Sequence, residues 1–109
     1  MKALISVIFR TPEQFGRDSD PRSHGKEKGS CYRACLVVEG GNGNHLDIQF
    51  NEENVFTRGE RYVTEIESIL DEMIDYSEIK TGKKFVICES GKIVADGRIL
   101  ATSPATKED

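Results

Sequence analysis

Three cysteines and two histidines are the residues of this chain best suited to covalent or metal chemistry. Cys31 and Cys35 are four residues apart, so a strand would place both thiols on one face but well separated along it. Zinc sites favour cysteine pairs at tight turns, and Cys88, His24 and His45 supply no second pair. A thiol nucleophile also needs a base and an orienting third group, which the sequence does not indicate. We therefore predict no catalytic, cofactor-binding or metal-binding residues.

Two other patterns imitate functional motifs. Neighbouring carboxylates occur at Glu52-Glu53, at Glu65 and Glu67, and at Asp71-Glu72. Such runs are more typical of a solvated face than of a catalytic acid–base pair, because nothing in the sequence marks them as buried. Residues 40–44 are rich in glycine, but a strand is expected to follow them, whereas a phosphate cradle needs the amides of a helix. The sequence therefore predicts a turn here, and the lack of a G-x-x-x-x-G-K-[ST] motif predicts no GTP or ATP binding.

Residues 11–30 are predicted to form a long loop without regular structure, because prolines and glycines interrupt any helical or strand periodicity. Residues 10–33 carry six Lys or Arg against four acids, the one basic cluster of the chain. Phe15 is the only large apolar residue of the loop, so it either pins the loop to the fold or lies exposed as an anchor for a partner. A mixed-charge surface loop is the simpler alternative to a binding site. The candidate contact residues are Phe15, Arg17, Arg22, His24, Lys26, Lys28, Tyr32 and Arg33.

The elements that must position these residues are mainly strands. Apolar residues alternate with polar ones, or form short β-branched runs, in six segments. We predict strands at about 3–10, 30–39, 45–50, 60–67, 83–89 and 92–100, with the last two joined as a hairpin. The apolar spacing after Ile66 fits an amphipathic helix, so we expect a short helix at about 67–76, although one longer helix over 60–76 would fit the periodicity too. The expected fold is an all-β, mainly antiparallel six-stranded barrel.

The length and composition limit the domain count and the class of partner. With 109 residues the chain is expected to hold one domain, residues 1–101, followed by a disordered tail at 102–109. Fifteen Lys and Arg against nineteen Asp and Glu give a net charge of −4, which argues against broad binding to nucleic acid or to membranes. The apolar run at residues 3–9 is too short to span a membrane. An odd number of cysteines without an export signal predicts a cytoplasmic protein.

Residues 82–97 resemble the closing hairpin of the C-terminal β-barrel domain of translation elongation factor Tu. That family has an F-x-I-x-E-x-G-x-x-V pattern ending at a glycine, matched here by Phe85, Ile87, Glu89, Gly91, Val94 and Gly97. Residues 29–38 look like the second strand of the same domain, and the resemblance covers residues 1–101. It implies a barrel related to one that contacts the T stem of aminoacyl-tRNA and protein partners. Ala34 replaces the usual proline, and the 109 residues contain neither the nucleotide-binding domain nor the second barrel. The resemblance therefore implies a lone barrel put to another use.

Three functions remain open at this stage. The first is a non-catalytic binding module that recognises a protein, for example an accessory or immunity-type protein that imitates the elongation-factor barrel. The second is an RNA-binding module, for tRNA-like RNA, that uses the basic loop at residues 10–33. The third is a small cysteine-dependent enzyme. The sequence indicates neither the identity of the partner nor the oligomeric state.

Overall fold

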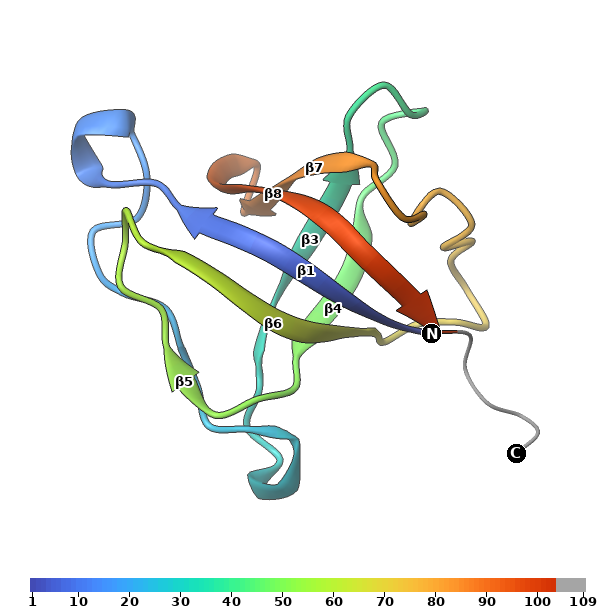
Figure 1. Cartoon of the computed structure of the whole chain (residues 1–109), viewed down its shortest axis with the longest axis horizontal. Coiled ribbons are helices and arrows are strands. Elements are labelled where there is room, and N and C mark those ends of the chain that lie inside the picture. Colours follow the sequence, from blue (N-terminus) through green and yellow to red (C-terminus); the bar gives the residue numbers. More distant parts are fainter. Residues whose placement is uncertain (104–109) are drawn as a thin grey trace.

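The computed structural model describes residues 1–103, and its regular secondary structure consists almost entirely of antiparallel strands (Figure 1). Six strands close into a barrel in the order β1-β6-β4-β3-β7-β8, so the first strand pairs with the last. They are β1 (Lys2–Phe9), β3 (Tyr32–Val38), β4 (Leu46–Phe50), β6 (Arg61–Ser68), β7 (Lys84–Glu89) and β8 (Lys92–Ser103). A separate ribbon pairs β2 (Arg22–Ser23) with β5 (Asn54–Val55). Two 3-10 turns, η1 (Pro12–Gln14) and η2 (Lys26–Lys28), lie between β1 and β3.

The predicted all-β class and the closed six-stranded barrel are confirmed. The predicted strands coincide with the observed ones to within one or two residues, except that β8 continues to Ser103. Thr102 and Ser103, which were expected to belong to the tail, pair instead with Ala3 and Lys2 of β1. The rest of the predicted disordered tail, residues 104–109, lies outside the described residues.

One apolar core fills the barrel, and the alternation of the strands builds it. On β4, the side chains of Leu46, Ile48 and Phe50 point inward and are fully buried, as period-2 alternation predicts. On the closing hairpin, the Phe85 ring lies over Gly97, where a Cβ atom would come within 2.3 Å of the ring. Gly97 is therefore required because the ring occupies the space that a side chain would need.

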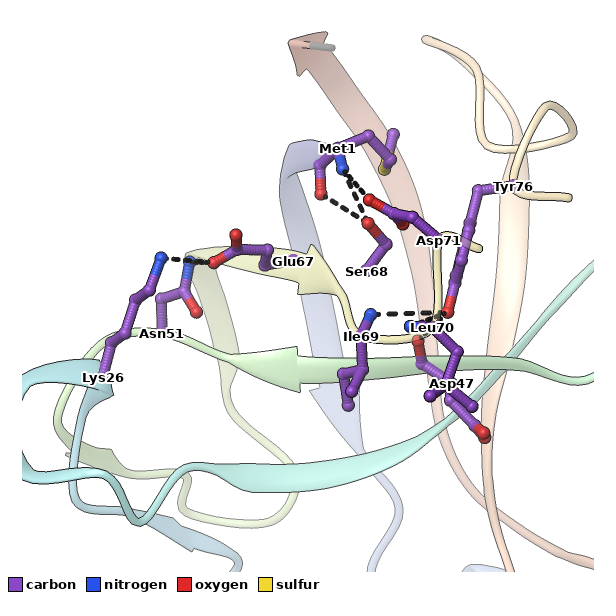
Figure 2. Close-up of polar contacts among 10 residues, drawn as sticks. All are labelled: Met1, Lys26, Asp47, Asn51, Glu67, Ser68, Ile69, Leu70, Asp71 and Tyr76. Carbon is purple, nitrogen blue, oxygen red and sulfur yellow. Dashed lines mark hydrogen bonds and ion pairs between the residues drawn. The ribbon is translucent and has the colours of Figure 1, made fainter. Parts of the chain in front are cut away.

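The helix predicted at 67–76 is not formed, and neither is a longer helix over 60–76. Glu67 and Ser68 complete β6, and a single turn follows, closed by the Met73 and Ile74 amides on the carbonyl oxygen of Leu70. The competing interaction is at the barrel rim. There the Tyr76 hydroxyl donates to the Asp47 carbonyl at 2.6 Å and accepts from the Ile69 and Leu70 amides (Figure 2). Tyr76 thereby links those amides to β4 at the barrel rim. No helix among residues 1–103 is long and apolar enough to cross a membrane.

The loop at residues 11–30 has more regular structure than its prolines and glycines predicted. Besides η1, η2 and β2, it is fastened to the segment after β4 by backbone hydrogen bonds: Phe56 N donates to Pro21 O, and Lys26 N to Asn51 O, both at 2.8 Å. The loop gains stability from pairing with another loop rather than from burying large side chains. In Figure 1 it crosses one end of the barrel beside β5.

Candidate functional site

The basic segment 10–33 places six of its eight predicted contact residues at three separate positions. Phe15 lies at the end of η1, near the end of β1. Arg17 and Tyr32 meet at the tip of the β7–β8 hairpin. His24, Lys26 and Lys28 lie around η2, beside residues 51–53. The segment therefore does not form one continuous basic surface.

Ion pairs engage most of the cations of this segment. Lys26 Nζ lies 2.8 Å from Glu67 Oε1 (Figure 2), and Lys28 Nζ lies 3.8 Å from Glu53. The other two pairs join Arg17 to Glu89 and Arg10 to Asp96. A carboxylate already beside each cation competes with any phosphate that approaches, so the paired side chains are poorly placed for RNA.

Arg22 and Arg33 differ from the other cations of the segment. Both side chains are exposed, and within residues 1–103 neither takes part in an ion pair. Arg22 lies on β2 and Arg33 on β3, in different sheets. They are the cations of the predicted site that remain available to an anionic partner.

Glu89 joins Arg17 to Tyr32 at the tip of the β7–β8 hairpin. One oxygen accepts from Arg17 Nε at 3.0 Å, the Tyr32 hydroxyl donates to the other, and the Arg17 guanidinium lies 5.7 Å from the centre of the Tyr32 ring. Burial, together with the Glu89 carboxylate, raises the pKa of Tyr32 far above its ordinary value, so this hydroxyl stays protonated. Arg17 and Tyr32 thus fasten the loop to the hairpin. The sequence singled out Glu89 only as part of the hairpin pattern.

A groove of about 540 Å³ separates η2 from the segment after β4. It is lined by His24, Gly25, Lys26, Glu27, Lys28, Asn51, Glu52, Glu53 and Glu65. Just beside it, burial works against ionisation of Glu67, but the hydrogen bonds from Lys26 and Asn51 outweigh burial and lower the pKa of Glu67. The groove therefore has mixed charge. Its acidic lining by Glu52, Glu53 and Glu65 was not predicted, because these carboxylates were interpreted only as a solvated face.

Phe15 is the large apolar residue of the loop, and it is exposed. Its side chain is 84% exposed, so it does not pin the loop to the barrel. Its backbone is left-handed, with φ 63° and ψ 31°, a conformation rarely adopted by bulky residues. The turn holds it there: Phe15 N donates to Pro12 O, and Gly16 N to Thr11 O, both at 2.9 Å. Gly16 is obligatory, since a Cβ at this position would lie 2.1 Å from the Arg10 carbonyl oxygen.

Cys35 and Cys88 lie on strands, whereas Cys31 lies directly before β3, within the basic segment 10–33. Cys35 on β3 pairs in register with Cys88 on β7, and its thiol donates to Asp47 Oδ1 at 3.0 Å. Burial, reinforced by the Asp47 carboxylate, raises the pKa of Cys35 to about 11, and burial also raises the pKa of Cys88. Both thiols are therefore protonated at neutral pH and are weak nucleophiles. In the part of the chain that is described, no three His, Cys, Asp or Glu side chains form a metal-binding cluster.

Comparison of the chain with family models and with curated proteins gave no match. The resemblance of residues 82–97 to the elongation factor Tu barrel therefore stays a prediction.

Proposed function

We propose that this chain is a non-catalytic binding module that recognises another protein through Phe15. The observation that carries the proposal is an aromatic side chain, 84% exposed, on an otherwise polar loop. Aromatic anchors of this kind dominate the binding energy of many protein interfaces, because they bury a large area with little loss of side-chain entropy.

The backbone at Phe15 supports the same proposal. A left-handed conformation at a bulky residue costs free energy, and such strain is found mainly where function requires it. The two turn hydrogen bonds hold the backbone of Phe15 in one conformation before any partner arrives. A rigid anchor binds more tightly than a mobile one, because less conformational entropy is lost on association.

The two other functions have weaker support. For RNA, the supporting observation is the pair of exposed cations, Arg22 and Arg33, but the remaining Lys and Arg of the segment are in ion pairs with carboxylates. For a cysteine-dependent enzyme, the raised pKa values of Cys35 and Cys88 are unfavourable. We further infer a cytoplasmic location, supported by three cysteines that are all free thiols.

The test places a photo-crosslinking phenylalanine analogue at position 15 and, as a matched control, at position 73. Met73 is 81% exposed and lies on the turn after β6, outside the basic segment. Crosslinking in a lysate of the source cells should give a discrete protein adduct from position 15 and none from position 73. An adduct that contains RNA, or equal labelling from both positions, would refute the proposal.

A second variant separates binding from folding. Phe15→Gly removes the ring but suits the left-handed backbone, so the free energy of unfolding should stay within about 1 kcal/mol of the original. Capture of the crosslinked partner by this variant should fall at least about tenfold, as expected for the loss of an interface anchor. Undiminished capture would show that Phe15 is not the contact.

Imitation of the elongation factor Tu barrel is one specific form of this proposal. If it holds, an excess of the isolated C-terminal barrel of that factor should displace the captured partner. A partner that is captured but not displaced would leave protein binding in place and remove the imitation.

A further inference from the structure

The outer face of β6, β1 and β8 carries an apolar patch that is separate from Phe15, the proposed partner contact. Val63 is 58% exposed, Leu4 41% and Leu100 38%. These are three of the six large apolar side chains that are exposed among residues 1–103, and they come from three strands that lie side by side, with β1 in the middle (Figure 1). Exposed apolar residues gathered on one face indicate an interaction surface.

The register of the strands explains why these side chains gather. Leu4 pairs with Glu65 on one side and with Ala101 on the other, and the register shifts between Leu4 and Ile5. That irregularity leaves Leu100 without a pairing partner on β1, so it lies beside Leu4 with its side chain partly exposed. A shallow groove of about 250 Å³ lies along the same strands, between Glu65 and the end of β8.

The charges on β6 are ordered around the centre of this patch. Arg61, Val63 and Glu65 follow one another at two-residue spacing, so all three side chains point outward. Arg61 donates to the Ser6 hydroxyl at 2.8 Å, and the Glu65 carboxylate accepts from the side-chain amide of Asn51. Within residues 1–103, neither of the two makes an ion pair. A cation and a carboxylate thus lie at equal distances on either side of an exposed valine.

We propose that this face is a symmetric interface between two copies of the chain. A two-fold axis that passes between the two Val63 side chains would place the two β6 strands antiparallel and face to face. Val63 of each copy would then contact Val63 of the other, and Arg61 of each copy would lie against Glu65 of the other. A two-fold interface requires a surface that is complementary to itself, and the order basic, apolar, acidic along one strand has this property. Leu4 and Leu100 would then be covered on both copies.

The test measures the oligomeric state by sedimentation over a dilution series. The expected mass at high concentration is twice the 12.2 kDa of one chain, falling toward 12.2 kDa on dilution. Arg61→Glu and Glu65→Arg should each weaken the dimer about tenfold or more, because like charges would face each other. The double variant Arg61→Glu/Glu65→Arg should restore dimerisation, since the reversed charges attract again.

Three controls make the result decisive. Val63→Asp should give a monomer, and Met73→Asp, an equally drastic change at another exposed apolar residue, should remain dimeric. Phe15→Gly should remain dimeric too, which separates this interface from the proposed partner-binding loop. Circular dichroism of each variant shows whether the barrel is intact, and the charge variants remain informative if Val63→Asp does not fold.

A single mass of 12.2 kDa at every concentration would overturn the proposal. So would a double charge reversal that fails to restore the dimer, or a Val63→Asp variant that dimerises as well as the original. If Val63→Asp instead abolishes capture of a different protein while the original is monomeric, the face serves a heterologous partner and the symmetric interface is wrong.

Discussion

The hydroxyl of Ser23 joins three segments of the chain at one buried point. It donates to the Phe50 carbonyl at 2.7 Å and accepts from the Tyr32 amide at 3.1 Å, and the residue has no exposed surface. One side chain therefore ties the loop to the ends of β3 and β4. Such a contact could not be recognised from the sequence, where Ser23 is one of several serines in a polar segment.

We expect Ser23→Ala to lower the free energy of unfolding by about 1–3 kcal/mol, because a buried carbonyl and a buried amide would lose their partner. Urea denaturation measures the change. Ser30→Ala is the matched control, since Ser30 is exposed and its side chain takes part in no hydrogen bond among residues 1–103. Equal effects of the two substitutions would show that Ser23 does not fasten the loop.

The thiol of Cys35 should be unreactive at neutral pH. Its pKa is raised to about 11 by burial and by the hydrogen bond to Asp47, so at pH 8 only about one molecule in a thousand carries the thiolate. Alkylation of Cys35, followed by mass spectrometry in a Cys31→Ser background, should accelerate about tenfold per pH unit up to pH 11. Asp47→Asn should speed the reaction at pH 8, because the negative charge that opposes ionisation is removed. Rapid alkylation of the original protein at pH 7 would contradict this prediction.

At the scale of the elements, the closing hairpin depends on the fit between Phe85 and Gly97. The two residues pair directly across β7 and β8, and a Cβ at position 97 would also lie 2.5 Å from the Ser6 carbonyl oxygen on β1. The glycine therefore lets three neighbouring strands approach one another at a point where the barrel curves.

Gly97→Ala should destabilise the barrel by about 1–3 kcal/mol, the usual cost of overpacking a core. Phe85→Leu alone should also destabilise the barrel, by loss of packing. The double variant should be more stable than the sum of the two effects, because the smaller side chain relieves the clash between the ring and the methyl group and leaves only the clash with the Ser6 carbonyl oxygen. Urea unfolding of the original protein, the two single variants and the double variant completes this double-mutant cycle. Strict additivity would mean that the ring is not what excludes a side chain at position 97.

For the whole molecule, the arrangement of charge predicts weak RNA binding. The net charge is −4, and four of the six Lys or Arg of the segment 10–33 are in ion pairs. Titration of a labelled tRNA should give, at physiological salt, no binding tighter than the non-specific range of about 10⁻⁴ to 10⁻⁶ M. Any binding at low salt should weaken as salt is added, and a plot of log K against the log of the salt concentration should have a slope of magnitude about two, from Arg22 and Arg33. Arg22→Ala should reduce that magnitude by about one. A steep slope that also depends on Lys26 would favour the RNA module instead.

Local pattern determined the barrel strands and their inward faces. Alternation along β4, the short run in β1 and the hairpin of β7 and β8 are properties of neighbouring residues, because a strand that covers a core must alternate or be apolar throughout. The basic loop and its single large apolar residue, Phe15, were identifiable in the same way, from composition alone. The sequence pattern also located all six barrel strands to within one or two residues, apart from the end of β8.

Only the tertiary structure decided what distant residues do to one another. The apolar period after Ile66 fits a helix, but the hydroxyl of Tyr76 accepts from the Ile69 and Leu70 amides, donates to the Asp47 carbonyl of β4 and holds that segment at the barrel rim. The cations of the loop look available in the sequence, yet Glu67 and Glu89 approach them from strands 41 and 72 residues away. The bond of Tyr76 to Asp47 and the ion pairs of Lys26 and Arg17 join residues 29, 41 and 72 positions apart, so no window of neighbouring residues contains them.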